Sequence, residues 1–305
     1  MRVIGAEEVA RRLTYQACLP LMREAMIALS QGRTKQLLRQ IIDLGGGNAF
    51  GVMPGSLDDG PFGAKLVSVF PGNVAAGGLS HQGAVLLFDP ATGAPTAVID
   101  AGELTAIRTA AASAAATDAL ARPDARSLAI LGTGEQARRH VEAIRLVRPI
   151  DRVTIWGRDP ARAAALAEAL DATSVPTVAE TVAEADIICT TTASPEPILS
   201  ARDVPDGAHL NLVGSSRAGS AEVDNELVAR ARFIADHREG VLAQGAEFLR
   251  AKAAGLVDDS HVAGEIGEVF AGTLPGRQRP AQLTAYKSLG SIVQDLAAAA
   301  FLLRS

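Results

Sequence analysis

The chain has 305 residues, of which 48% are hydrophobic and 21% charged, and this is typical of a globular protein with room for two domains. A formal net charge of −5 without a basic cluster argues against a nucleic-acid partner. The two cysteines lie far apart, which argues against a disulfide framework, and the five histidines are scattered, which argues against a metal site. The charged N-terminus is unlike a signal peptide, and no apolar run is long enough to span a membrane. We therefore expect a cytoplasmic protein.

The first third of the chain predicts a helix followed by an antiparallel sheet. Apolar residues recur at helical spacing through residues 6–31. Short apolar runs separated by Gly, Pro, Asn and Asp then predict strands, and the turn Asp89–Gly93 predicts a hairpin. These predicted strands are residues 37–44, 50–53, 64–70, 83–88 and 95–100. A long Ala-rich helix over 104–121 follows, and we expect it to bridge two domains.

From residue 127 the pattern alternates between strand and helix, which predicts a parallel sheet with right-handed crossovers. Two further apolar runs lie at 231–235 and 262–266, and an Ala-rich helix is predicted over 285–303. Its composition matches the first domain, so we expect the chain to return there. The strands of the alternating region are predicted at 127–131, 152–156, 174–175, 186–190 and 209–213, and the helices at 137–147, 160–170 and 178–183.

The first strand of this region leads into a dinucleotide-binding fingerprint of the form GxGxxA. Gly132 permits a sharp turn, Gly134 lets a pyrophosphate approach the backbone, and Ala137 lets the next helix pack closely. The helix N-terminus offers unpaired N–H groups to the phosphates. We therefore expect residues 132–137 (Gly132, Thr133, Gly134, Glu135, Gln136 and Ala137) to bind a dinucleotide; the alternative is a tight turn without a ligand.

The end of the second strand bears on the choice of dinucleotide. An acidic residue there would hydrogen-bond the ribose of NAD. Here Gly157 and Arg158 follow the strand, and an arginine can pair with the 2′-phosphate of NADP. Asp159, just before Pro160, is expected to cap a helix. The pattern favours NADP(H), with NAD(H) possible; alternatively, Arg158 is a solvated loop charge.

Three basic residues interrupt apolar surroundings and are candidates for binding an anion. Lys65 shares a strand face with Val67 and Val69, so it either lies near a strand end or points into a site. Arg108 lies near the start of a small-residue helix, next to Thr109, although an exposed arginine would fit the same pattern. Arg39 is flanked by apolar residues and is otherwise uninformative.

Several motifs, in order along most of the chain, resemble the ornithine cyclodeaminase/mu-crystallin family. They are Gly51–Pro54, Ala64–Val67, Ser80–Phe88, Leu104–Ala111, Gly132–Ala137, Asn211–Gly214 and Tyr286–Gly290. The resemblance implies an α/β fold, in which a Rossmann-type doubly wound parallel sheet is inserted into a second, α+β domain for substrate binding and dimerisation. We expect residues 1–117 and 281–305 to form the substrate domain, and residues 118–280 the Rossmann domain.

The resemblance also implies roles for single residues. Arg39, Lys65 and Arg108 would hold a substrate carboxylate, and Lys65 would be placed to assist proton chemistry. Thr109 would touch the cofactor phosphates. The remaining cofactor candidates lie after two later strands: Thr191, Val213 and Gly214.

One departure separates the branches of the family. Ornithine cyclodeaminases carry an aspartate shortly after the Val-Gly pair, where this chain has Ser216, which cannot act as an ionised base near neutral pH. The sequence therefore favours NAD(P)H-dependent reduction of a small imine carboxylate, such as Δ1-pyrroline-2-carboxylate or Δ1-piperideine-2-carboxylate. Ser216 would either bind the substrate ring or bind nothing, and the resemblance implies a homodimer. The alternatives are another amino-acid dehydrogenase of the family (acting on alanine or iminosuccinate), a cyclodeaminase, and a non-catalytic NADPH-binding protein.

Overall fold

The computed structural model describes residues 1–58, 60–215 and 219–304. It divides the chain into two compact units. Unit 1 comprises residues 1–108 and 291–305, and unit 2 comprises residues 109–290. The helix α3 (Ala101–Leu120) contributes residues to both.

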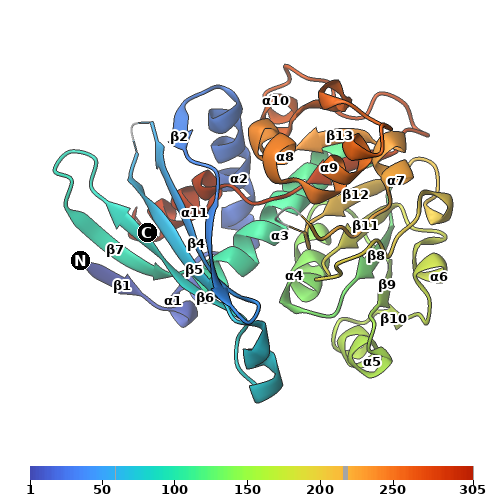
Figure 1. Ribbon diagram of the computed structural model, residues 1–305, viewed down its shortest axis with the longest axis horizontal. Helices are drawn as coiled ribbons and strands as arrows, with labels where there is room; N and C mark the ends of the chain where they lie inside the picture. Colours follow the sequence, from blue (N-terminus) through green and yellow to red (C-terminus); the bar gives the residue numbers. More distant parts are fainter. Residues whose placement is uncertain (59, 216–218, 305) are drawn as a thin grey trace. The chain divides into compact units, whose positions relative to one another are not determined.

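Unit 1 is built on a seven-stranded sheet with the order β1-β7-β6-β5-β4-β2, in which β3 also pairs with β4 (Figure 1). The pair β1–β7 is parallel and the other pairs are antiparallel. The predicted hairpin is confirmed, since β6 and β7 pair across the turn at Asp89–Gly93. The strands are β1 (Arg2–Ile4), β2 (Thr34–Gln36), β3 (Gln40–Gly45), β4 (Asn48–Leu57), β5 (Phe62–Val69), β6 (His81–Phe88) and β7 (Pro95–Asp100).

Helices cover part of this sheet. The single helix predicted over 6–31 is in fact two helices, α1 (Ala6–Arg12) and α2 (Tyr15–Ser30), because Thr14 adopts an extended conformation and caps α2 through its side chain. The C-terminal helix α11 (Ile292–Arg304) packs on α2 and on the strands β4, β5 and β6. Figure 1 shows α11 (red) against the strands from the N-terminal part of the chain. A short 3₁₀ turn, η1 (Pro71–Ala76), joins β5 to β6.

Unit 2 is built on an eight-stranded sheet with the order β10-β9-β8-β11-β12-β15-β13-β14, in which every pair is parallel. The strand order reverses between β8 and β11, which is the topological switch point of a Rossmann fold. The fold predicted from the alternating pattern is confirmed. The strands are β8 (Ser127–Leu131), β9 (Arg152–Trp156), β10 (Thr173–Ser174), β11 (Ile187–Thr190), β12 (His209–Leu212), β13 (Arg232–Ala235), β14 (Val262–Glu265) and β15 (Thr284–Lys287).

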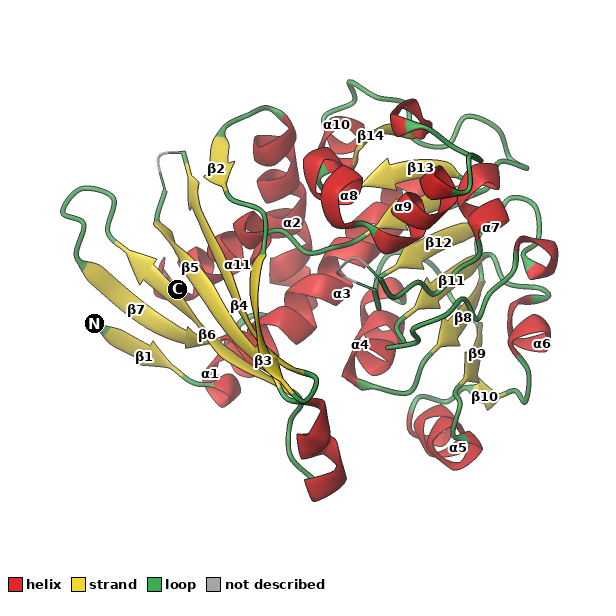
Figure 2. Cartoon of the chain, viewed as in Figure 1, coloured by secondary structure: helices red, strands yellow, loops and turns green. Residues whose placement is uncertain are grey.

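Short helices connect these strands, and Figure 2 shows them around the strands of unit 2. They are α4 (Glu135–Ile144), α5 (Pro160–Ala169), α6 (Val178–Val182), α7 (Asn225–Arg230), α8 (Arg238–Gln244), α9 (Ala246–Ala253) and α10 (Ile266–Phe270), with 3₁₀ turns at Ala201–Asp203 and Asp259–His261. None of the helices in the described part of the chain is long and apolar enough to cross a membrane.

The C-terminal prediction was wrong in one respect. Residues 284–287 form the strand β15 rather than the start of a helix, because their backbone pairs with both β12 and β13. The last helix therefore begins at Ile292, after the left-handed Gly290. For this reason the structure places 281–290 in unit 2, whereas the expected boundary lay at 280/281.

The other expected boundary, 117/118, lies within α3, where the structure divides the chain at 108/109. The side chains of the second half of α3 bond within unit 2: the Asn211 amide donates to Thr117 Oγ1 at 2.9 Å, and Ser113 Oγ lies 2.9 Å from His140 Nε2.

Candidate active site

Unit 1 contains a buried cluster of charged side chains, which we call the cationic cluster: Lys65, Arg108 and Asp295. Lys65 Nζ donates to Asp295 Oδ1 at 3.2 Å and to Thr105 Oγ1 at 2.5 Å. Arg108 Nε donates to the same Oδ1 at 3.0 Å. The three residues are 5%, 3% and 0% exposed, so these charges lie almost out of reach of water.

Three elements bring the cluster together. Lys65 lies on β5, directly opposite Met53 of β4, and its side chain points to the covered face of the sheet. Arg108 lies on the part of α3 that belongs to unit 1. Asp295 lies on α11, among Ala and Leu residues that pack on the same sheet. The structure thus assigns Lys65 to a buried cluster rather than to a strand end, and Arg108 to the interior rather than to an exposed helix face.

The cluster holds two basic groups against one carboxylate. Burial lowers the pKa of Lys65 to about 8, with Asp295 opposing this shift and Arg108 reinforcing it. Burial alone would raise the pKa of Asp295, but Arg108 and Lys65 outweigh it and hold this pKa below its usual value. With all three groups ionised, one positive charge remains unneutralised in a buried position, where an anionic ligand would be strongly favoured.

Donor and acceptor groups remain available in the cluster. Arg108 Nη1 donates to Gln294 Oε1 at 2.8 Å, but no described residue accepts a hydrogen bond from Nη2. Asp295 Oδ2 is buried and has no hydrogen-bond partner among the described residues. A ligand that accepts a hydrogen bond from a guanidinium and donates one to a carboxylate would satisfy both atoms.

Arg39 lies beside this cluster. Its Nε is 3.4 Å from Met53 Sδ, and Met53 pairs with Lys65 across the strands. Its positive charge also contributes to the lowered pKa of Lys65. The structure therefore brings together the three basic residues that were expected to hold a carboxylate.

In unit 2, the glycine loop lies at the carboxyl end of β8. Gly132 has a φ of 133°, and a Cβ there would lie 2.5 Å from Thr191 Oγ1, so the turn requires glycine. Gly134 is the N-cap of α4 without a side-chain cap, and a Cβ there would meet open space. The first N–H groups of α4 are therefore left for a ligand, and Ala137 is fully buried beneath them.

Around the loop, Glu135 pairs with Arg139 one turn along α4, at 2.6 Å. The side-chain oxygen of Gln136 is buried and has no partner among the described residues. A Cβ on Gly157, after β9, would lie 2.3 Å from Thr133 Cγ2, so this glycine is needed for loop packing.

Arg158 is exposed and has no side-chain partner among the described residues. Asp159 caps α5 by accepting from the N–H groups of Ala161 and Arg162, as the sequence predicts. Because the carboxylate of Asp159 is occupied by the cap, Arg158 is the charged side chain that this turn leaves available to a ligand.

A buried carboxylate, Glu222, joins the loops at the carboxyl ends of β11 and β12. Its Oε1 accepts from the Thr192 N–H at 2.6 Å and from Thr192 Oγ1 at 2.7 Å. Its Oε2 accepts from Thr190 Oγ1 at 2.7 Å and from the Gly214 N–H at 2.8 Å. A Cβ on Gly214 would lie 2.0 Å from the Thr192 carbonyl, so this approach of the two loops requires glycine.

A second buried pair supports the same loops. Lys287 Nζ lies 2.7 Å from Glu247 Oε2, and both side chains are 0% exposed. Lys287 Nζ also donates to the Ser215 carbonyl at 2.5 Å. Thr191 Oγ1 in turn donates to the Leu131 carbonyl at 3.1 Å, and Val213 is 8% exposed. The loop candidates Thr191, Val213 and Gly214 are therefore held at one edge of the sheet.

Two remaining candidates are less informative. Thr109, the first residue of unit 2, is 7% exposed. Ser216 lies outside the described residues.

Sequence reasoning missed Asp295 and Glu222. An Asp in an otherwise small and apolar helix was the available signal for Asp295. No pattern pointed to Glu222, whose four donors come from two distant loops. Among the described residues, no group of three or more His, Cys, Asp or Glu side chains could hold a metal ion.

Comparisons with known proteins cover nearly the whole chain. The model of the ornithine cyclodeaminase/mu-crystallin family matches residues 2–304. The ketimine reductase mu-crystallin of Mus musculus is 36% identical over 304 residues, covering 97% of this chain and 94% of that protein. The Δ1-pyrroline-2-carboxylate reductase of Paracoccus denitrificans is 34% identical over 291 residues, covering 92% of each.

A solved structure is similar over the full length. The Δ1-pyrroline-2-carboxylate reductase of Thermococcus litoralis, in complex with NADH and L-proline, aligns with a TM-score of 0.97 at 29% sequence identity. The alignment covers 100% of this chain and 97% of that one.

Proposed function

Because the chain belongs to the ornithine cyclodeaminase/mu-crystallin family, we propose that it reduces a small cyclic imine carboxylate to the corresponding L-amino acid with a hydride from NAD(P)H. The relatives named above are reductases of ketimines and of Δ1-pyrroline-2-carboxylate. The observation that carries the proposal is the cationic cluster, which combines an excess positive charge with a lysine of lowered pKa.

The residues of unit 2 fit a dinucleotide. The glycine loop, the open space at Gly134 and the uncapped N-terminus of α4 form a phosphate cradle at the carboxyl edge of the sheet. We assign phosphate binding to residues 132–137 with Thr109, and the remaining cofactor contacts to Gly157, Arg158, Thr191, Val213 and Gly214. A bound NAD(P)H supplies the hydride.

The residues of unit 1 hold the substrate and a proton. Arg108 and Arg39 bind the carboxylate through their guanidinium groups. Lys65 donates a proton from Nζ to the imine nitrogen, so that the imine carbon becomes electrophilic and accepts the hydride. Asp295 Oδ2 accepts a hydrogen bond from the N–H that forms. We assign no role in proton transfer to Ser216, because a serine hydroxyl is not an ionised base near neutral pH.

The substrate assignment is tested by steady-state assays of the purified protein with NADPH and with NADH. The substrates are Δ1-pyrroline-2-carboxylate, Δ1-piperideine-2-carboxylate, pyruvate with ammonia, and ornithine. We expect turnover of one or both cyclic imines. Turnover of pyruvate with ammonia alone would identify an open-chain dehydrogenase, ammonia release from ornithine would identify a cyclodeaminase, and cofactor binding without turnover would identify a binding protein.

Replacing Arg108 tests the carboxylate site. We expect Arg108→Ala to raise the KM of the imine at least about 30-fold, since a buried charge-assisted contact is worth roughly 2–5 kcal/mol. The matched control is Arg33→Ala, at an exposed arginine of unit 1. Unchanged kinetics in Arg108→Ala would overturn the assignment.

We further propose a preference for NADP(H), based on the exposed Arg158 and on Asp159, whose carboxylate is engaged in the cap of α5. Arg158→Ala is expected to raise the KM of NADPH about tenfold or more, because a guanidinium–phosphate contact is lost. NADH, which lacks the 2′-phosphate, is the internal control. Equal effects on both cofactors would contradict the preference.

We also propose that the protein is a homodimer formed through β3. All six residues of this strand are exposed, and Ile41, Ile42 and Leu44 are 44%, 58% and 53% exposed. Exposed apolar strands of this kind are usually covered by a partner.

A further inference from the structure

Unit 2 contains a cavity that the proposed reaction does not use. Its volume is about 570 Å³, and it lies where β13, β14 and β15 begin. The glycine loop and the loops held by Glu222 lie where the strands of the same parallel sheet end. The cavity is therefore at the edge of the sheet opposite to the cofactor site.

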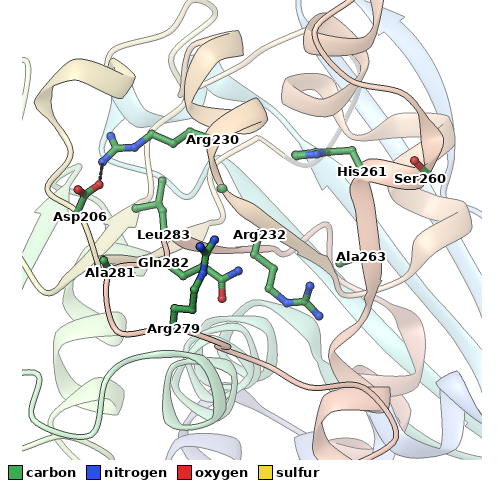
Figure 3. A pocket seen from close by; sticks show the side chains of 11 residues that line it. Asp206, Arg230, Arg232, Ser260, His261, Ala263, Arg279, Ala281, Gln282 and Leu283 are labelled. Atoms are coloured by element: carbon green, nitrogen blue, oxygen red, sulfur yellow. Dashed lines mark hydrogen bonds and ion pairs between the residues drawn. The ribbon is translucent and has the colours of Figure 1, made fainter.

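The charged groups that line this cavity are mostly basic. Three arginines, Arg230, Arg232 and Arg279, face one carboxylate, Asp206, together with the neutral donor Gln282 (Figure 3). Three positive charges less one negative charge leave a net charge of +2 in the lining. This excess occurs in a chain whose formal net charge is −5.

The four charged side chains differ in what they bond. Arg230 is engaged, since its Nη2 donates to Asp206 at 2.6 Å and its Nη1 donates to the Ala201 and Val204 carbonyls. Among the described residues, Arg232 bonds only the main-chain oxygens of Gly276 and Pro275, through Nε and Nη2, and no carboxylate there pairs with its charge.

Arg279 has no side-chain partner at all in the described part of the chain. Its backbone carbonyl accepts from the Gln282 N–H at 3.0 Å, which holds the two residues in one turn. In Figure 3, Arg279 and Gln282 lie close together near the centre of the view and Arg232 lies beside them with its guanidinium extending to the right, while Arg230 and Asp206 lie on the left.

A fourth arginine, Arg277, adds positive potential next to the residues that line the cavity. Arg277 donates to the carbonyls of Gln282 and Pro280, and it too pairs with no carboxylate in the part of the chain that the structure describes. Burial and the charge of Arg122 lower the pKa of Arg277 to about 10, which means that it remains charged at neutral pH. Uncompensated arginines that converge on one cavity are typical of sites for multivalent oxyanions.

We propose that this cavity binds a small phosphate-type dianion, either inorganic phosphate or the phosphate group of a small monoester. Arg279 and Arg232 Nη1 donate to the phosphate oxygens, Gln282 Nε2 donates to a third oxygen, and the dianion neutralises the net charge of the lining. The volume beyond the phosphate leaves room for a small organic group. The proposal does not depend on the reductase activity.

The test is isothermal titration of the full chain with inorganic phosphate, without cofactor and with saturating NADH. We expect one site with a millimolar or lower Kd, and at least tenfold weaker binding of acetate at matched ionic strength, since a monoanion neutralises half of the charge. Arg279→Ala is expected to weaken phosphate binding about tenfold, and Arg279→Glu to abolish it. Because Arg279 is exposed and its side chain makes no hydrogen bond or ion pair with the described residues, both variants should fold.

The matched control is Arg126→Ala, an exposed arginine before β8 on the same edge of the sheet. It should leave the Kd for phosphate unchanged. Titration of glycerol phosphate separates the two sources: tighter binding than inorganic phosphate indicates a monoester, and equal binding indicates the free ion. The proposal would be overturned if phosphate did not bind, or if it bound Arg279→Glu as tightly as the wild type. It would also be overturned if NADH abolished phosphate binding, since phosphate would then occupy the cofactor loop.

Discussion

At the scale of single residues, Asp295 decides how the cationic cluster works. It pairs with both Lys65 and Arg108 through one oxygen and leaves the other oxygen without a described partner. Without this carboxylate, two positive charges would face each other almost out of reach of water, which is strongly destabilising. With it, the cluster keeps one excess positive charge and a lysine whose pKa is lowered to about 8.

The pH dependence of the reaction follows from Lys65. Its pKa is lowered to about 8, so the ammonium form that donates a proton dominates below pH 8 and is lost above it. We expect kcat/KM for the imine to fall as the pH rises through about 8. Lys65→Arg should bind substrate but lose about 10²–10⁴ in kcat, because the guanidinium is a poor proton donor.

The comparison of pH profiles is decisive, because the substrate titrates in the same way in both proteins. If kcat/KM of Lys65→Arg falls at alkaline pH in the same way as that of the wild type, Lys65 is not the proton donor.

Residues also show where sequence reasoning ended. Lys65 and Arg108 could be singled out because a basic residue in an apolar pattern is conspicuous in the sequence itself. Asp295 meets them only through packing of the last helix on the sheet, across 230 residues of chain from Lys65. The role of Glu222 depends on two loops that approach each other in three dimensions, and no local pattern encodes such an approach.

At the scale of elements, the N-terminus of α4 combines a structural need with a binding site. A helix start without a cap is less stable than one with Asp, Asn, Ser or Thr at the N-cap. Here Gly134 occupies the N-cap and leaves the first N–H groups unsatisfied. The absence of a side-chain cap at Gly134 therefore favours binding of a phosphate ligand and lowers the free energy of unfolding.

Gly134→Asp separates these two effects. The new side chain would meet open space at a backbone conformation that an aspartate cap adopts, with φ −89° and ψ −173°. We expect the free energy of unfolding to rise by about 0.5–2 kcal/mol while dinucleotide affinity falls at least tenfold, because the carboxylate takes the N–H groups and repels phosphate. Thermal unfolding and titration with NADH measure both.

The control for this substitution is Gly134→Ala, which adds a Cβ without a charge and should weaken binding less. Unchanged NADH affinity in Gly134→Asp would contradict the assignment of the loop.

Among elements, the regular alternation of strand and helix made the Rossmann sheet predictable. The strand β15 was mistaken for helix because its pairing with β12 and β13 involves residues far away in sequence.

At the scale of the whole molecule, the exposed strand β3 predicts the state of association. We expect the protein to sediment as a dimer and Ile42→Lys to shift it to a monomer, because a charge on an apolar interface strand opposes pairing. Leu256→Lys, at an exposed leucine of unit 2, is the matched control and should remain dimeric. A wild-type monomer, or a dimer that persists in Ile42→Lys, would rule out β3 as the interface.

The order of the segments along the chain has a consequence for biosynthesis. A ribosome makes both cations of the cluster first, then all of unit 2, and only afterwards the helix that carries their counter-ion. Until that helix emerges, the sheet of unit 1, whose last strand ends at Asp100, exposes the face on which α11 will pack. Unit 2, as one uninterrupted stretch, can mature meanwhile, so we expect nascent chains to acquire nucleotide affinity well before any capacity for turnover.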